Sequence, residues 1–310
     1  MARPDVTILM GSHNGARYLP QQIASFVQQR GVRWRLIVSD DGSCDLTRQI
    51  IRGRARDLPI HLIHGPCQGY VANYLHLLAQ LPPDTGVVAL SDQDDVWLPH
   101  KLARALHKMG EGAMPVLYCA RSRHCDADMR LGGASRRFRR APAFRNALVQ
   151  NIASGHSIVL NAPAAALARQ AAIMLRAKGA ASFPASHDWF LYQLVTGAGG
   201  AVIYDPAVVV HYRQHSTNTI GANSGFAAMV QRGRLLLRGR FADWAHANRQ
   251  ALTATESLLT PSARAELRAF AALQTPRPLA RLRGMARLRL WRQSPLSTCA
   301  LWAVALAGKI

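Results

Sequence analysis

Long apolar runs are missing from this chain of 310 residues, although 49% of its residues are hydrophobic. No run reaches the roughly 18 apolar residues that a membrane-spanning helix needs, so we expect no ordinary transmembrane segment. The first five residues also lack the apolar stretch of a secretory signal peptide. The chain is long enough to bury a substantial core in one or two domains. We expect it in the cytoplasm.

Cysteine is scarce and irregularly placed. The five cysteines are odd in number, are scattered along the chain and include no CxxC pair. This spacing argues against a disulfide framework and against a common type of zinc site.

Acidic residues are also few, with 17 Asp and Glu against 38 Lys and Arg, which gives a formal net charge of +21. Such an excess implies an anionic partner, and nucleic acid, an anionic membrane surface and phosphorylated small molecules all qualify. If the proteins of the source genome are generally rich in arginine, that usage would explain part of this excess of basic residues. Residues 226–310 hold 14 Lys and Arg but three acids, whereas acids cluster in the first half of the chain, at Asp40, Asp41, Asp45, Asp92, Asp94 and Asp95.

The densest group of acids is Asp92-Gln93-Asp94-Asp95, which follows the apolar run 87–90 and Ser91. Carboxylate oxygens are the ligands of hard divalent cations, and Mg²⁺ is usually held by one or two carboxylates plus substrate phosphates. Without a cation, these carboxylates would repel one another and raise their own pKa values. The tetrad therefore favours a metal-bound phosphate compound at a strand end. An acidic turn that caps the next helix is the alternative.

Strand and helix patterns alternate over the first ninety residues. The expected strands are 6–10, 34–38, 60–63 and 87–90, and the expected helices are 19–27, 46–51 and 70–81. This order predicts an α/β fold, with a mostly parallel sheet covered by helices on both faces. Ligands bind such sheets beyond the carboxyl ends of the strands. The polar turns 11–15, 40–43 and 91–95 fall there, so we expect them to share one site.

The pattern is looser beyond residue 100. We expect an arginine-rich loop over 121–146, which either clamps a phosphate or is simply solvated. The other expected elements are a strand at 115–120, a short strand at 158–160, a helix over 163–175, and two short strands at 202–204 and 208–210 bent around Asp205-Pro206.

The chain from residue 225 onward is predicted to be helical, basic and separate. One helical face is expected to carry Leu279, Leu282, Ala286 and Leu290, with arginines around it. The segment 296–306 is apolar apart from Ser and Thr; it is too short to span a bilayer but long enough to lie in its interface. A core helix with a basic solvent face explains the same pattern equally well.

Five ordered segments resemble glycosyltransferase family 2, in particular its bacterial rhamnosyltransferase-type members of cell-surface polysaccharide synthesis. These segments are 6–15, 37–45, 90–97, 187–190 and 212–218. The resemblance implies a GT-A fold over residues 1–224, with a donor half at about 1–120 and an acceptor half at about 121–224. The basic helical region 225–310 follows and is not covered.

The resemblance also implies an inverting sugar transfer from a nucleotide-diphosphate sugar. By this resemblance, Asp40 and Asp41 lie against the nucleotide base, and Ser12 borders the nucleotide. Asp92 and Asp94 match the DXD element that approaches the ribose and a Mg²⁺ or Mn²⁺ ion. His215 belongs to a late motif near the diphosphate and joins the expected metal site.

Asp188 matches the family's catalytic base, a carboxylate that takes the proton of the attacking hydroxyl. From the residues alone, capping of the helix 189–195 is the commoner role for Ser186-His187-Asp188. The residues expected on the acceptor side are Asn151, Gly155, His187 and Trp189. His187 either orients Asp188 or caps the helix, and core packing is the commoner role of a tryptophan such as Trp189.

Three positions depart from the family pattern. Arg121 stands where relatives often carry an acidic or small residue, His156 where Cys is frequent, and Cys44 where Thr is usual. Arg121 and His156 fall on the expected acceptor side. These departures therefore leave the identity of the acceptor open, whereas they bear less on the type of reaction.

We therefore expect a metal-dependent inverting glycosyltransferase. It would move a sugar from dTDP-rhamnose or a UDP-sugar to a hydroxyl of a cell-surface glycan or lipid-linked acceptor. The basic C-terminal region would hold it at the anionic inner face of the cytoplasmic membrane.

Two alternatives are a basic nucleic-acid-binding protein and a non-catalytic sugar-nucleotide-binding subunit on the same fold. We expect no nucleic-acid partner, because the Arg-rich stretches lack a recognisable binding motif. The joint presence of Asp92, Asp94 and Asp188 argues against a non-catalytic subunit.

Overall fold

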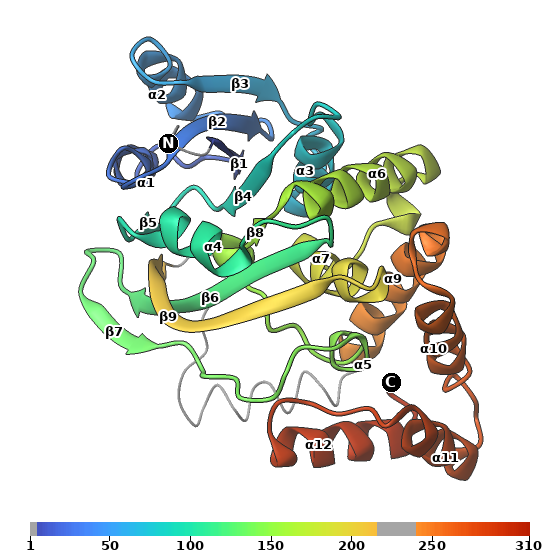
Figure 1. Ribbon diagram of the computed structural model, residues 1–310. Coiled ribbons are helices and arrows are strands. Elements are labelled where there is room, and N and C mark those ends of the chain that lie inside the picture. Colours follow the sequence, from blue (N-terminus) through green and yellow to red (C-terminus); the bar gives the residue numbers. More distant parts are fainter. Residues whose placement is uncertain (1–4, 216–239) are drawn as a thin grey trace.

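The strands expected in the first ninety residues form, and in the order expected. The computed structural model describes residues 5–215 and 240–310. These strands are β1 (Asp5–Ser12), β2 (Arg33–Asp40), β3 (Ile60–His64) and β4 (Val87–Ser91). They lie parallel in the order β3-β2-β1-β4 (Figure 1). In β1, Ile8 and Met10 are buried on one face and Leu9 on the other, as expected for a central strand covered on both sides.

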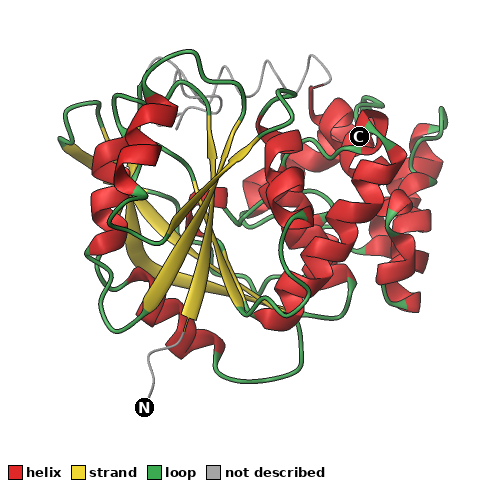
Figure 2. Ribbon diagram, turned by 90° about the horizontal axis from the view of Figure 1, so that it is seen from above, coloured by secondary structure: helices red, strands yellow, loops and turns green. Residues whose placement is uncertain are grey.

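Helices cover both faces of this sheet (Figure 2). On one face, apolar residues pack from α1 (Leu19–Val27), α2 (Thr47–Arg54) and α4 (Lys101–Met109). On the other face, the packing helices are α3 (Tyr70–Ala79), α6 (Ala162–Lys178) and α7 (His187–Gly197). Helix α4 was not predicted from the sequence. The structure is therefore the expected mixed α/β fold with a largely parallel sheet.

The second half of the chain extends the same sheet. Beyond β4 the order continues through β8 (Val159–Leu160), β6 (Val116–Cys125), β9 (Ala201–Arg213) and β5 (Val96–Trp97). β6 and β9 are parallel, whereas β8 runs antiparallel to β4 and β6, and β5 runs antiparallel to β9. The short strand β7 (Leu131–Ala134) pairs with β6.

Two expectations for this half were wrong. The two short strands around Asp205-Pro206 are one strand, β9, because a bulge absorbs the bend: Ala120 pairs with Asp205 and Arg121 pairs with Val208. The stretch 121–146 is not one loop. It contains the end of β6, β7 and the short helix α5 (Phe144–Ala147).

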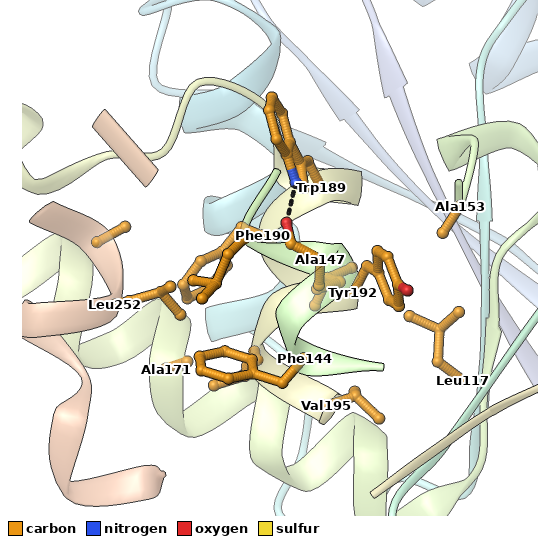
Figure 3. Close-up of a cluster of buried hydrophobic side chains, with 14 of the residues drawn as sticks. Leu117, Phe144, Ala147, Ala153, Ala171, Trp189, Phe190, Tyr192, Val195 and Leu252 are labelled. Carbon is orange, nitrogen blue, oxygen red and sulfur yellow. Dashed lines mark hydrogen bonds between the residues drawn. The ribbon is translucent and has the colours of Figure 1, made fainter. Parts of the chain in front are cut away.

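The C-terminal helices pack on the α/β domain. They are α9 (Arg240–Ala254), α10 (Pro261–Ala271), α11 (Pro278–Leu288) and α12 (Pro295–Leu306). One apolar cluster extends from Leu9 of β1 through α7 to Ile310. In Figure 3, Leu252 of α9 lies beside Phe190 and Ala171 in this cluster. The domain boundary expected at residues 224 and 225 lies outside the described residues.

Of the apolar face predicted for residues 279–290, only Leu290 is buried. Leu279 is 69% exposed, whereas Arg281, Met285 and Leu288 are buried. The Arg281 guanidinium donates to the carbonyl oxygens of Leu273 and Ala305, at 3.2 and 2.6 Å, which satisfies this buried cation. Among the described residues, no helix combines the length and the apolar character needed to cross a bilayer.

Candidate active site

The three polar turns line one cleft of about 1240 Å³. It lies at the carboxyl ends of β1, β2 and β4, where ligands bind parallel sheets. Its other walls come from a 3₁₀ turn at Gly155–Ser157, from the first residues of α7 and from the end of β9. Of the residues predicted from the sequence, those that line it are Ser12, Asp41, Asp92, Asp94, Gly155, His187, Asp188 and His215.

The first loop and the acidic tetrad are joined by Gln93. Its Oε1 accepts from the backbone N–H of His13 and its Nε2 donates to the carbonyl of His13, each at 2.9 Å. A Cβ at Gly15 would lie 2.1 Å from Gln93 Oε1, so a larger residue there would displace the end of the Gln93 side chain. The residue between the two aspartates thus fixes the loop that borders the cleft, a role that the sequence did not indicate.

The two aspartates at the end of β2 have different surroundings. Asp40 is buried, accepts from the backbone N–H of Ser43 at 3.1 Å, and pairs with Arg48 at 3.2 Å. It does not line the cleft, contrary to its expected place beside the nucleotide. Asp41 does line it, and its two oxygens accept from the backbone N–H groups of Cys67 and Gly69 at 2.7 and 2.8 Å.

Asp92 lies at the base of the cleft against Tyr74. The Tyr74 hydroxyl is 3.0 Å from Asp92 Oδ1 and 2.5 Å from the carbonyl oxygen of Ser91. The desolvated position of the carboxylate, and then the negative charge of Asp94, raise the pKa of Asp92 to about 7. A bound cation would reverse this shift, because a nearby positive charge favours the ionised form.

Asp94 and His215 pair with each other, and both line the cleft. His215 Nε2 lies 2.8 Å from Asp94 Oδ2, and the His215 ring stacks on Tyr18 with ring centroids 4.6 Å apart. The sequence placed both residues in the metal site, and they meet although they are 121 residues apart in the chain. The rest of that late motif, residues 216–218, lies outside the described residues.

A buried group of charges lies behind Asp92. Asp95 is fully buried; its Oδ1 accepts from the backbone N–H of Arg213 at 3.1 Å, and its Oδ2 has no hydrogen-bond partner among the described residues. His156 Nδ1 lies 3.9 Å from Asp95 Oδ2 and 4.0 Å from Asp92 Oδ2. Lys101, also fully buried, donates from Nζ to the carbonyl of His156 at 2.8 Å.

Burial shifts the pKa values of Asp95, Lys101 and His156. It raises the pKa of Asp95 well above its usual range, with Asp94 and Asp92 adding to the effect, and it lowers the pKa of Lys101 well below its own. Burial, followed by the charge of Lys101, lowers the pKa of His156 to about 3, so its ring is neutral near pH 7.

The residues present fit a divalent cation. Ligand atoms of Asp92, Asp95 and His156 lie within 4.8 Å of one another, and Asp94 with His215 supplies another oxygen–nitrogen pair in the same cleft. Neutral imidazole and carboxylate are ligands that Mn²⁺ accepts, and carboxylate suits Mg²⁺. The unpartnered Asp95 Oδ2 is a buried acceptor of the kind that such an ion satisfies.

Asp188 lies in the first turn of α7 and faces the cleft. Its Oδ1 accepts from Ser186 Oγ at 2.6 Å and from the backbone N–H of Trp189 at 2.7 Å. Its Oδ2 accepts from the backbone N–H of Gly155 at 3.2 Å. These donors hold the carboxylate in a fixed orientation. Asp188 therefore both accepts local hydrogen bonds at the start of α7 and faces the cleft.

His187 packs below Asp188. Its ring stacks on Tyr74 with ring centroids 3.8 Å apart, and neither ring nitrogen has a hydrogen-bond partner among the described residues. Burial lowers the pKa of His187 to about 4, although Asp188 acts in the opposite direction. The ring is thus neutral near pH 7 and fills space beside the carboxylate.

Two of the predicted acceptor-side residues do not line the cleft. Trp189 is 6% exposed and its Nε1 donates to the carbonyl of Ala147 at 2.6 Å, inside the apolar cluster (Figure 3). Neighbouring residues on a helix point about 100° apart. Trp189 therefore points into the core, whereas Asp188 faces the cleft. Asn151 accepts from the backbone N–H of Ala153 at 3.0 Å and shapes its own loop.

Several aromatic residues of the cleft were missed by the sequence analysis. Tyr70 and Tyr74 lie one turn apart on α3, and both line the cleft. Their spacing of four residues places them on one helical face, and this spacing is the signal in the sequence that could have indicated them. Tyr18 and Tyr212 also line it, and Tyr212 stacks on His156 with ring centroids 4.7 Å apart.

Comparison with known proteins identifies the family. The model for glycosyl transferase family 2 matches residues 7–173. The dTDP-rhamnosyl transferase RfbG of Shigella flexneri is 24% identical over 239 residues, which cover 72% of this chain and 77% of that protein. An uncharacterized glycosyltransferase of Nostoc sp. is 35% identical over 102 residues, about a third of each chain (32% and 31%).

Solved structures agree on the fold. Residues 1–349 of S. aureus TarS superpose with a TM-score of 0.52 at 13% identity, covering 98% of this chain and 89% of that one. The mannosyltransferase PcManGT of Pyrobaculum calidifontis, solved with GDP-Man and Mn²⁺, gives a TM-score of 0.50 at 19% identity, with 98% and 85% coverage. With a family model that spans more than half of its residues, this chain belongs to glycosyl transferase family 2 and is a glycosyl-transferring enzyme with the GT-A fold.

Proposed function

We propose that this enzyme transfers a sugar from a nucleoside-diphosphate sugar to an acceptor hydroxyl with inversion at the anomeric carbon. One observation carries the proposal: Asp92 and Asp94 of the tetrad line the same cleft as Asp188. The first two lie at the end of β4, and Asp188 is presented by the start of α7. Donor-binding acids and a separate carboxylate thus face one shared volume.

The donor occupies the side of the cleft formed by the first loop and Asp41. The backbone there is fixed by Gln93 and by the hydrogen bonds of Asp41 to Cys67 and Gly69. Ser12 and Asp92 border the nucleotide in this arrangement. Asp94 and His215, with Asp92, hold Mg²⁺ or Mn²⁺, which when bound neutralises the charge that develops on the diphosphate leaving group.

Asp188 acts as the general base. Its Oδ1 already accepts two hydrogen bonds and its Oδ2 accepts one, so Oδ2 has the greater capacity for an acceptor hydroxyl. As the hydroxyl oxygen attacks the anomeric carbon from the face opposite the diphosphate, its proton passes to Asp188. The bond from the anomeric carbon to the diphosphate breaks, and the nucleoside diphosphate leaves.

The donor named for the Shigella relative makes dTDP-rhamnose the first donor to test. TarS has been solved with UDP-GlcNAc, so UDP-sugars form the second group. The acceptor is a hydroxyl of a cell-surface glycan or lipid-linked glycan, as in polysaccharide synthesis. The basic C-terminal helices hold the enzyme at the anionic inner face of the cytoplasmic membrane, where each Lys or Arg contributes about 1 kcal/mol.

A thermal-shift screen of dTDP, UDP and GDP, each with and without Mn²⁺, tests this proposal. We expect one nucleotide to raise the melting temperature, and to do so more strongly with Mn²⁺, because binding to the native state stabilises it. Absence of any metal-dependent shift with all three nucleotides would contradict the proposed donor site.

A further inference from the structure

Arg213, the last residue of β9, is a buried arginine that contacts the acidic tetrad. Only 2% of the residue is exposed. Its Nε donates to the carbonyl oxygen of Asp94 at 2.8 Å, and its backbone N–H donates to Asp95 Oδ1 at 3.1 Å. One residue from the second half of the sheet therefore holds both the backbone and a side chain of the tetrad.

The other two guanidinium nitrogens of Arg213 reach two further segments. Nη1 donates at 2.7 Å to the carbonyl oxygen of Ala127, which follows β6 and lines the cleft. Nη2 donates at 2.5 Å to Gln21 Oε1, on α1. The three side-chain nitrogens thus join the tetrad, the loop after β6 and the first helix. The single nitrogen of a lysine cannot replace three bonds that start from three separate atoms of a planar fork.

Arg213 also supports His215, which lies two positions further along the chain. The guanidinium carbon of Arg213 lies 4.7 Å from the ring centroid of Tyr18, and the Tyr18 ring stacks on His215 with ring centroids 4.6 Å apart. His215 Nε2 in turn lies 2.8 Å from Asp94 Oδ2. Arg213 is therefore linked to both members of the Asp94–His215 pair, to Asp94 through its carbonyl oxygen and to His215 through the chain and Tyr18.

We infer that Arg213 is a positioning residue for the cation site, because it fixes Asp94 and His215 in the places from which they bind the metal ion. The inference rests on the proposed function, in which these two residues hold Mg²⁺ or Mn²⁺. Arg213 does not line the cleft, so it acts through the two ligands. Removing a group that orients metal ligands through hydrogen bonds commonly weakens metal binding by about 10 to 100-fold.

The sign of the effect on metal affinity distinguishes positioning from charge. The guanidinium group of Arg213 is positively charged, so it repels a cation bound by the neighbouring Asp94. If this charge were all that Arg213 contributed, removing it would strengthen Mn²⁺ binding. A positioning role has the opposite consequence, because loss of the hydrogen bonds releases the two ligands from their places and weakens Mn²⁺ binding.

Binding of Mn²⁺ alone to the full-length protein, followed by electron paramagnetic resonance, tests the inference. We expect Arg213→Gln to weaken Mn²⁺ binding by about 10 to 100-fold. The matched control is Arg281→Gln. Arg281 is also a buried arginine whose guanidinium donates to backbone carbonyl oxygens, but it lies among the C-terminal helices. This control should lower the melting temperature as Arg213→Gln does and leave the Mn²⁺ affinity unchanged.

Unchanged or tighter Mn²⁺ binding in Arg213→Gln would overturn the inference. Equal weakening in Arg281→Gln would also overturn it, since the loss of affinity would then follow from general destabilisation. If Arg213→Gln does not fold, Arg213→Lys serves in its place. It keeps the positive charge, so a loss of Mn²⁺ affinity in Arg213→Lys reports on the missing hydrogen bonds, and an unchanged affinity would contradict the positioning role.

Amide hydrogen exchange in the metal-free protein separates this inference from the proposed function. We expect Arg213→Gln to speed exchange in the segments 92–95 and 126–130, whose carbonyl oxygens lose their donor, and Arg281→Gln to leave both segments unchanged. Failure of the unaltered protein to bind Mn²⁺ would reject the proposed cation site. Unchanged exchange in Arg213→Gln would instead overturn the positioning role of Arg213, whatever the result with Mn²⁺.

Discussion

At the scale of single residues, Gly155 controls the position of Asp188. Its N–H donates to Asp188 Oδ2 at 3.2 Å, and a Cβ there would lie 2.9 Å from His187 Nε2 and 3.6 Å from Asp188 Cβ. A methyl group therefore needs either the His187 ring or the Gly155 backbone, which donates to Asp188, to shift. Because the base works only within hydrogen-bond reach of the hydroxyl, small displacements here are costly.

For Gly155→Ala we expect the rate of sugar transfer to fall by about 10 to 100-fold, since misplacement by an ångström can cost that much. Nucleotide affinity should change little, because the donor binds the opposite wall. Initial rates and calorimetric nucleotide binding check this. Gly112→Ala, where a Cβ meets nothing within 4 Å, is the control. A normal rate in Gly155→Ala would show that this contact does not position the base.

His187 makes the stability depend on pH. Burial lowers its pKa in the folded state to about 4 from the usual 6.5, so between these values the unfolded chain binds more protons than the folded one. This contribution to stability is complete above pH 6.5 and is lost as the pH falls toward 4. It amounts to roughly 3 kcal/mol by the linkage relation.

Urea unfolding between pH 7 and 4 should therefore show a shallower loss of stability in His187→Gln than in the unaltered protein. The exposed His107 provides the matched substitution His107→Gln, which should leave the pH slope unchanged. Parallel pH profiles for the unaltered protein and His187→Gln would contradict a buried, neutral His187.

At the scale of elements, Gln93 couples the first loop to the end of β4. Its two hydrogen bonds to His13 hold a loop that lines the donor side of the cleft. We expect Gln93→Ala to weaken nucleotide binding by roughly 5 to 10-fold, about 1 kcal/mol for the loss of the clamp. Nucleotide titration calorimetry measures this.

The exposed Gln28, just after α1, gives the control Gln28→Ala, which should bind nucleotide normally. Unchanged affinity in Gln93→Ala would mean that the loop holds its shape without the clamp.

The elements that the sequence predicted are those with uninterrupted local signals. Strands β1 to β4 are apolar runs followed by polar turns, so their existence and their shared edge were evident. Strand β9 was divided in two because Pro206 looked like a break, whereas the pairing with β6 absorbs it in a bulge. Strand β7 and helix α5 lie within an arginine-rich stretch whose composition resembles a loop.

The same distinction holds for the site. Asp92, Asp94 and Asp188 belong to contiguous motifs, and they reach the cleft as the sequence suggested. The buried contacts of His156 with Asp95 and Lys101 join residues up to 61 positions apart, and no local pattern marks them. Asp40 and Trp189 were assigned to the ligand by motif alone, whereas their burial directs them into the protein.

At the scale of the whole molecule, the C-terminal helices complete the core. Leu252 of α9 is fully buried in the cluster that includes Phe190 of α7 and Ala171 of α6 (Figure 3). Removing the helices would expose this cluster, so a truncated chain should not fold normally. Tests of membrane binding therefore require point substitutions within the full chain.

We expect Leu252→Ala to lower the free energy of unfolding by about 2–4 kcal/mol, the usual cost of a cavity at a buried leucine. Denaturant unfolding checks the value, with Leu279→Ala as the exposed control (69% exposed), expected to change stability by under about 0.5 kcal/mol. Equal effects of the two substitutions would mean that α9 is not part of the cooperative core.

The net charge of +21 should also govern membrane attachment. If the basic helices bind the anionic inner leaflet, raising the salt concentration should release the enzyme from membranes, because screening weakens surface attraction. Immunoblots of salt-washed membranes measure this. Retention through both high salt and carbonate would contradict peripheral binding.

The most direct test of the account is calorimetric titration of the preferred nucleotide diphosphate, with and without Mn²⁺, into the unaltered enzyme, Asp94→Ala and Asp188→Asn. We predict that Mn²⁺ strengthens binding to the unaltered enzyme and to Asp188→Asn alike, and that Asp94→Ala loses this enhancement. If Asp94→Ala kept the full Mn²⁺ enhancement, or Asp188→Asn lost it, then the cation would not be held by the tetrad across the cleft from Asp188, and the account would be wrong.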